Sequence, residues 1–169
     1  DAASRLSFIR TAANLMCSSV SSNLRSDSVG DMLVVENPEL LEEAVSNGRG
    51  VVLLLSHMGN WELLTRLRGT FPEGTKLGGF YRPLNNPIIN ERVLREREGD
   101  GARLFSKRDS LHHVSGFLRD NGVVGILADQ RVGRQGELVE FFGRLTRASP
   151  LPSLLVRRCK SEVLALSFR

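Results

Sequence analysis

The stretch "VVLLLSHMGNWELL", Val51 to Leu64, decides how this chain folds. Its first five residues are all apolar, a pattern typical of a strand that is covered on both faces of a parallel sheet. Polar residues follow at once, and His57 and Glu62 lie five positions apart. Residues five apart on one helix point roughly 140° away from each other, because each residue turns the chain by about 100°. The sequence therefore predicts that His57 ends a strand and that Glu62 lies in the first turn of a helix.

The residues between His57 and Glu62 suit a turn from strand to helix. Gly59 supplies backbone freedom for the turn, and Asn60 is a good N-cap residue. A carboxylate in the first helical turn stays ionised, because the helix dipole and the unpaired N–H groups favour its charge. Glu62 is therefore predicted to orient the imidazole of His57 and to stabilise its protonated form, which makes a general base near neutral pH. Trp61 is expected to pack beneath this corner.

Outward from this corner, apolar runs alternate with helical patterns along the chain. This alternation predicts an α/β fold, with a largely parallel β-sheet flanked by helices, in a single domain over residues 1–169. We expect the chain to be truncated at both ends, because it opens on Asp1 and stops within a strand-like segment. A polar loop is predicted over 131–137. Strands are predicted over 31–36, 50–56, 75–82, 102–106, 123–130 and 161–168, and helices over 4–24, 38–48, the segment after the corner to about 68, 86–98, 108–122 and 149–160.

Composition and motifs limit the kinds of reaction that the chain could catalyse. The net charge is +4, and only three of the 23 basic residues are lysine. Arginine binds phosphate and carboxylate through two parallel hydrogen bonds, so an acidic or phosphorylated partner is one explanation and an arginine-rich coding bias is the other. Cys17 and Cys159 match no metal or redox spacing, and neither H-E-x-x-H nor G-x-S-x-G occurs. Direct transfer remains, in which His57 activates an acceptor hydroxyl that attacks a bound acyl donor.

Three predicted strands end in residues that carry chemistry. "LLLSH" ends at His57, "GGFYRP" reaches Arg82, and "GILADQR" ends in Asp129, Gln130 and Arg131. Ligands of open α/β sheets gather at the carboxyl ends of the strands, so we expect these residues to surround one site. Arg82 suits either phosphate or oxyanion binding or a structural salt bridge. Asp129 suits either a site role or a loop cap.

The sequence resembles a known enzyme family at several of these positions. His57-Met-Gly-Asn-Trp-Glu62 is similar to the H-x4-D/E motif of the glycerolipid acyltransferase superfamily. The longer "GRGVVLLLSHMGNWELL" resembles its lipid A biosynthesis branch, the late acyltransferases of lauroyl and myristoyl type. "FYRPLNNPIIN" resembles the second block of that branch, and "VVGILADQ" with "FFGRLTRASP" resembles the third. The similarity extends from about Val35 to the C-terminus.

The resemblance implies an acyltransferase without a cofactor or metal, with the glycerolipid acyltransferase fold. Such an enzyme moves a fatty acyl chain from acyl carrier protein, or acyl-CoA, to a hydroxyl of a phosphorylated glycolipid. The acceptor is a lipid A precursor or a related glycolipid such as a phosphatidylinositol mannoside. The expected location is the cytoplasmic face of the bacterial inner membrane, with the membrane surface as a partner. The residues expected at the site are His57 and Glu62 as the catalytic pair, and Asn60, Arg82, Asp129, Gln130 and Arg131 at the substrates.

Two alternative functions stay open. An arginine-rich domain could bind nucleic acid through its phosphates, but no nucleic-acid-binding motif occurs and no such partner is expected. A relative that has lost catalysis could bind acyl lipids, although the intact pair of His57 and Glu62 speaks against it. A basic cluster also follows the third block and is either a solvated face or a docking patch for an acidic carrier protein or a phosphorylated lipid. This cluster consists of Arg131, Arg134, Arg144 and Arg147.

Overall fold

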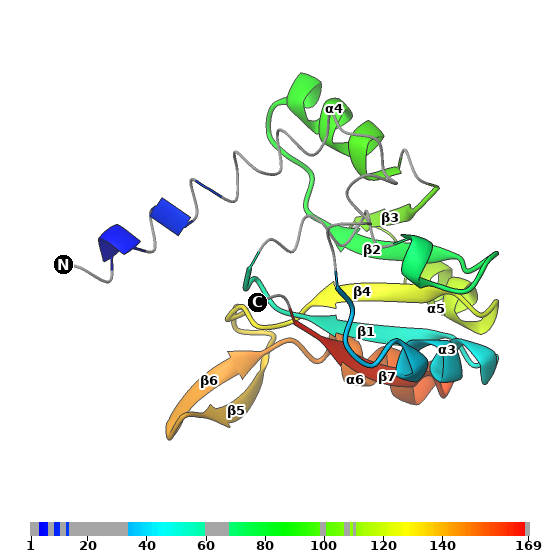
Figure 1. The fold of residues 1–169 in the computed structure, drawn as a ribbon. Coiled ribbons are helices and arrows are strands. Elements are labelled where there is room, and N and C mark those ends of the chain that lie inside the picture. Colours follow the sequence, from blue (N-terminus) through cyan, green and yellow to red (C-terminus); the bar gives the residue numbers. More distant parts are fainter. Residues whose placement is uncertain are drawn as a thin grey trace.

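Figure 1 shows the computed structural model of the protein, which describes residues 4–6, 9–10, 13, 34–59, 68–98, 101–106, 109 and 111–167. Within these residues, five strands form one parallel sheet in the order β3-β2-β4-β1-β7. The predicted parallel α/β fold is therefore confirmed. The strands are β1 (Val51–Leu55), β2 (Leu77–Tyr81), β3 (Arg103–Ser106), β4 (Val123–Leu127) and β7 (Glu162–Leu166).

The central pair of strands is β1 and β4, which lie in register from Val51 beside Val123 to Leu55 beside Leu127. Side chains of β1 alternate between the two faces of the sheet. Val52 packs with one hydrophobic cluster, whereas Val51 packs with the other, and neither is exposed to solvent. Because both faces are covered, the strand has no polar position, which explains its continuous apolar run.

Helices cover both faces of the sheet (Figure 1). On one face, α5 (Leu111–Arg119) and α6 (Leu151–Cys159) bury Leu118 and Leu155 against the sheet. On the other face, α3 (Pro38–Ser46) packs Val45 beside β1. Burial of one such leucine or valine side chain contributes roughly 1.5–3 kcal/mol, so these two layers supply the main apolar stabilisation of the fold.

The helix α4 (Pro87–Glu98) connects β2 to β3. Its start is fixed by the Oδ1 atom of Asn86, which accepts hydrogen bonds from the backbone N–H groups of Ile88 at 3.0 Å and Ile89 at 3.2 Å. These bonds satisfy N–H groups that have no partner inside the helix. The predicted helix start at Asn86-Pro87 is confirmed.

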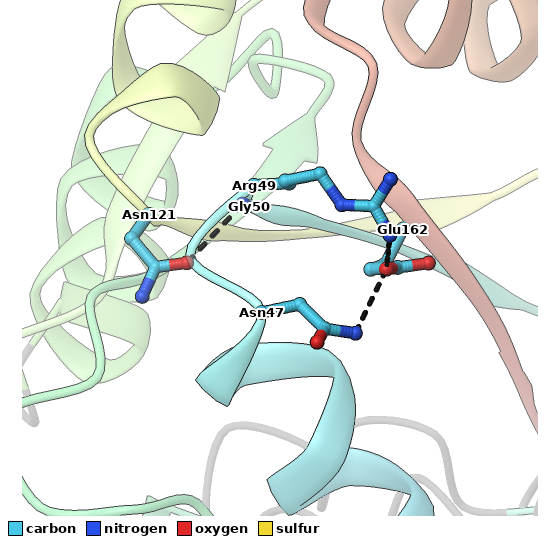
Figure 2. A network of polar contacts seen from close by, with 5 residues as sticks. All are labelled: Asn47, Arg49, Gly50, Asn121 and Glu162. Atoms are coloured by element: carbon cyan, nitrogen blue, oxygen red, sulfur yellow. Dashed lines mark hydrogen bonds and ion pairs between the residues drawn. The ribbon is translucent and has the colours of Figure 1, made fainter.

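A polar network, which we call the amino-end network, joins the segments that precede β1, β4 and β7 (Figure 2). Glu162 forms an ion pair with Arg49 and accepts a 2.9 Å hydrogen bond from the Asn47 side chain. Asn121 accepts a 3.2 Å hydrogen bond from the Gly50 backbone N–H and donates a 3.1 Å bond to the Val45 carbonyl. The network therefore ties the end of α3 to the starts of β1, β4 and β7.

A two-stranded antiparallel hairpin extends away from the parallel sheet, on the side to which β1 and β4 point (Figure 1). It consists of β5 (Glu137–Phe141) and β6 (Arg144–Ala148), joined by Phe142 and Gly143. Both linking residues have positive φ, 50° and 71°, as in the type I′ turns that suit two-residue hairpins. The sequence predicts a polar loop over 131–137 and no strand between that loop and the helix over 149–160, so this hairpin is a correction.

Three predicted elements lie partly outside the described residues. The strand predicted over 31–36 is wrong for residues 34–36, which run as irregular chain into α3, and residues 31–33 lie outside the described part. The predicted helix over 4–24 is described only at residues 4–6, 9–10 and 13, which are helical, and most of the helix predicted after the corner also lies outside. Among the described residues, no helix has the length and apolar character needed to cross a membrane.

Candidate active site

His57 stands just beyond the end of β1, as predicted. The chain leaves the strand after Leu55 and bends through residues 57–59. Gly59 has a φ of +63°, which glycine adopts without a steric penalty, so the predicted need for backbone freedom at this position is confirmed. The neighbouring Ser56 directs its Oγ atom into a buried position. A hydroxyl hidden from solvent is not placed to act as a nucleophile on a substrate.

Asp129 holds His57 at two points. The Oδ1 atom of Asp129 lies 2.7 Å from His57 Nδ1, and its Oδ2 atom accepts a 2.8 Å hydrogen bond from the His57 backbone N–H. The register explains the meeting, because Leu55 pairs with Leu127 and each of the two residues stands two positions further along its strand. One carboxylate therefore fixes both the backbone and the ring of the histidine.

The charge on Asp129 follows from these contacts. Partial burial raises the pKa of Asp129, but hydrogen bonds from the His57 ring and backbone outweigh that effect and hold the pKa below its ordinary value of 3.8. The carboxylate is thus ionised at neutral pH and can only accept hydrogen bonds, so Nδ1 must carry a proton. In a neutral imidazole the lone pair then lies on Nε2. This tautomer is the one that can take a proton from a hydroxyl.

The carboxyl-end site, as we call His57 and Asp129, is open to solvent. The side chains of His57 and Asp129 are 30% and 37% exposed. Arg82 follows β2 directly, and Gln130 and Arg131 follow Asp129, so all three stand at the same end of the sheet and are exposed. No hydrogen bond or ion pair joins these three to His57 or Asp129 within the described chain. The remaining predicted residues, Asn60 and Glu62, lie outside the described residues, as does Trp61.

Sequence reasoning gave Asp129 a place at the site but missed its role as the partner of Nδ1. The available signal was the equal spacing of His57 and Asp129 from the ends of their apolar runs, "VVLLLSH" and "VVGILAD". In a parallel pair, residues at equal distances from aligned positions lie side by side. The missing information was that β1 and β4 are neighbours, which no local pattern states.

The predicted basic cluster divides into two kinds of arginine. Arg147 donates hydrogen bonds to the backbone carbonyls of Arg134, at 3.3 Å, and Gly136, at 2.7 Å. It therefore fastens the hairpin to the loop that follows Asp129. The side chains of Arg131, Arg134 and Arg144 are exposed. Arg147 thus has a structural task, and the other three are available to a partner.

A mostly apolar cavity of about 130 Å³ lies on the α3 side of the sheet. It is formed by α3, β1, β7 and the segment at residues 70–71, and Leu53 and Leu166 are among its lining residues. Leu166 pairs with Leu55, the last residue of β1, so the cavity reaches the carboxyl-end half of the sheet. Its lining offers mostly apolar surface to a bound group.

Comparisons with known proteins identify the family of this chain. The sequence pattern of the bacterial lipid A biosynthesis acyltransferase family matches residues 8–169. The chain belongs to this family. A phosphatidylinositol mannoside acyltransferase of Mycobacterium tuberculosis (strain ATCC 25618 / H37Rv) is 31% identical over 130 residues, 72% of this chain and 39% of that protein. One of Mycolicibacterium smegmatis (strain ATCC 700084 / mc(2)155) is 30% identical over 138 residues, 75% of this chain and 42% of that protein.

This member of the lipid A biosynthesis acyltransferase family thus spans about two fifths of the length of the curated relatives that it matches. The resemblance inferred from the three sequence blocks is confirmed by the family match.

Proposed function

We propose that the protein transfers a fatty acyl group from a thioester donor to a hydroxyl of a phosphorylated glycolipid, with His57 as the general base. The observation that carries the proposal is the two-point contact between His57 and Asp129 at the carboxyl ends of β1 and β4. It supplies an oriented imidazole with a lone pair on Nε2, at the end of the sheet where α/β proteins bind ligands. Membership of an acyltransferase family supports the same chemistry.

The proposed reaction proceeds without a covalent enzyme intermediate. His57 Nε2 takes the proton of the acceptor hydroxyl as its oxygen attacks the thioester carbonyl carbon. The new C–O bond forms, the C–S bond breaks, and the imidazolium returns its proton to the departing sulfur. Asp129 stabilises the imidazolium between these two steps, because its carboxylate is ionised and hydrogen-bonded to Nδ1.

The other predicted residues receive supporting roles in this proposal. Glu62, five residues after His57 in the sequence, is assigned the role of a second carboxylate that supports the base. Arg82, exposed just past β2, binds a phosphate or the oxyanion of the transition state. Asn60, Gln130 and Arg131 shape the substrate site. The apolar cavity between α3 and the sheet takes part of the acyl chain.

The acceptor and the location are also part of the proposal. We propose a phosphorylated glycolipid acceptor, either a lipid A precursor or a phosphatidylinositol mannoside, since relatives named for the latter are about 30% identical to this chain. The proposed donor is acyl carrier protein or acyl-CoA. Because such acceptors reside in bilayers, we place the enzyme on the cytoplasmic face of the bacterial inner membrane.

The proposal is tested by supplying both donors and both acceptors. Purified protein is incubated with acyl carrier proteins and acyl-CoA of several chain lengths, together with either acceptor in detergent, and the products are identified by mass spectrometry. We expect a mass increase of one acyl group on one acceptor. His57→Ala serves as the control and should leave the acceptor unmodified. Absence of acyl transfer in every combination would overturn the proposal.

A further inference from the structure

The tip of the hairpin is an exposed apolar surface. We define the hairpin tip as residues 141–145, Phe141 to Leu145, at the turn between β5 and β6. Phe142 is 91% exposed, Leu145 75% and Phe141 64%, and the two phenylalanine rings contact each other edge to face at a centroid distance of 4.6 Å. Single exposed apolar residues are ordinary, but three exposed apolar side chains grouped at the tip of one projecting element mark an interaction site.

Phe142 occupies its position against the local conformational preference. Its φ of +50° is left-handed, which costs a residue with a Cβ atom roughly 1–2 kcal/mol, and Asn or Gly is preferred at this place of a type I′ turn. The turn alone therefore does not explain a phenylalanine. A bulky apolar ring held almost fully in solvent at such a place indicates that the side chain serves a partner.

The hairpin and the loop that leads to it carry a net positive charge. Arg144 belongs to the tip, and Arg131 and Arg134 are exposed in the loop that leads to β5. Together with Arg147 these arginines outnumber the nearby glutamates, Glu137 and Glu140. Aromatic side chains that insert among lipid headgroups, flanked by arginines that attract anionic lipids, are the features of a peripheral membrane contact.

We propose that the hairpin tip docks on an anionic lipid bilayer, with Phe141, Phe142 and Leu145 among the lipids and Arg144 on their phosphates. The loop that carries Asp129 continues directly into β5, and the hairpin extends from the end of the sheet that bears the carboxyl-end site (Figure 1). Docking therefore brings His57 close to a lipid acceptor. The inference rests on the proposed function only in taking that acceptor to be a membrane lipid.

Vesicle binding tests this proposal without any catalytic step. Protein is sedimented with vesicles of phosphatidylcholine alone, or of phosphatidylcholine and phosphatidylglycerol in equal amounts, at low and high salt. We expect binding to the anionic vesicles that weakens with salt. Phe142→Asn should weaken it about tenfold, because one inserted aromatic side chain is lost. Arg144→Gln should weaken it about fivefold and reduce the salt dependence.

The choice of variants separates docking from misfolding. Asn is favoured at the φ of residue 142, so Phe142→Asn keeps or stabilises the turn. Val163→Thr is the matched control, since it changes a 45% exposed apolar residue of β7, near the opposite ends of the strands, and should leave vesicle binding unchanged. Acyl transfer to an acceptor in detergent should be unaffected by Phe142→Asn.

Several outcomes would overturn the inference. Wild-type protein that ignores anionic vesicles contradicts it, and so does binding that both hairpin variants leave intact. A sedimentation experiment in which Phe142→Asn converts a dimer to a monomer, with no vesicle binding, would assign the tip to a second copy of the chain. Phe142-dependent binding of acyl carrier protein, again without vesicle binding, would assign it to the donor. Protein that binds vesicles through the tip but transfers no acyl group would contradict the proposed function alone.

Discussion

Polar residues of similar chemistry lie at both ends of the parallel strands. At the amino ends they are paired with other protein groups, whereas at the carboxyl ends some of them are not. At the amino ends, Glu162 pairs with Arg49 and Asn47, and Asn121 bonds two backbone groups on different segments. At the carboxyl ends, Asp129 forms two hydrogen bonds with His57. Arg82 and Arg131 are exposed at the same end of the sheet and form no ion pair in the described chain. Both clusters join residues that are distant in sequence.

The difference predicts which end stabilises the protein and which end acts on a ligand. Side chains of the amino-end network have protein groups as their partners, so their contribution is to stability. The carboxyl-end site leaves exposed cationic side chains and an oriented imidazole at the position where α/β sheets bind ligands. Substitutions at the carboxyl ends should therefore lower catalysis, and substitutions at the amino ends should lower stability.

The largest effect is expected for His57→Ala. Removing the proposed general base should lower the turnover number by about 10²–10⁴-fold. The urea midpoint should stay close to that of the wild type, because the His57 side chain is partly exposed and lies outside both hydrophobic clusters. A folded variant with undiminished turnover would remove His57 from the mechanism.

A smaller catalytic loss, on the order of 10²-fold, is expected for Asp129→Asn. An amide has one acceptor oxygen, so it cannot serve both the ring N–H and the backbone N–H of His57 as the carboxylate does. The loss should fall on the saturated rate more than on KM, because the residue acts through the base. Measuring Glu62→Gln in the same assay shows how far Asp129 and how far Glu62 orients the His57 ring. If only Glu62→Gln impairs the rate, Asp129 is a loop residue.

At the opposite ends of the strands, Asn121→Gly should change stability and leave catalysis alone. Glycine tolerates the φ of +55° at this position, so the substitution removes the hydrogen bonds of the side chain without straining the backbone. The buried Gly50 N–H then loses its acceptor, at a cost of about 1–3 kcal/mol in the free energy of unfolding. Turnover per folded molecule should match the wild type, and a large catalytic defect would contradict the division between the two ends.

The smallest effect is a dependence of stability on pH. The pKa of Asp129 is lower in the folded chain than its ordinary value of 3.8, so folding favours the ionised carboxylate. Its contribution is complete above about pH 4 and is lost as the pH falls through the folded pKa. Urea unfolding between about pH 5 and about pH 3 should show a shallower decline for Asp129→Asn than for the wild type. Identical declines would mean that the contact does not persist in solution.

Asp109 provides a reference for that measurement. The pKa of Asp109 is also held below its ordinary value, first by the hydrogen bond from the Ser106 backbone N–H. Part of the decline at low pH should therefore persist in Asp129→Asn and disappear only when Asp109→Asn is added.

The sequence predicted the parallel sheet well because its strands are covered on both faces. Continuous apolar runs such as "VVLLL" and "VVGIL" are decisive in that setting, and helix starts such as Asn86 follow from local chemistry. The hairpin escaped prediction for the opposite reason. Leu138 and Val139 point to different faces and are both exposed, so no alternation marks β5, and Phe142 is an unusual turn residue.

Only the part of the site that depends on local sequence could be predicted. That His57 ends a strand follows from the residues around it. That Asp129 meets His57 depends on β1 and β4 being neighbours across 72 residues of chain. Such pairing is decided by the competition of whole strands for places in the sheet, which a single local pattern does not record. The predicted contact between His57 and Glu62 stays a prediction.

The strand order also affects folding during synthesis. β1 is synthesised before both of its neighbours, so Val51 has no partner strand until Val123, and later Glu162, has been synthesised. At about 5–20 residues per second, the first partner strand follows roughly 4–14 s later, and during that interval five apolar residues have no strand beside them. Nascent chains of this protein are therefore expected to depend on chaperones until β4 emerges from the ribosome, and translation pauses between residues 56 and 122 should increase aggregation.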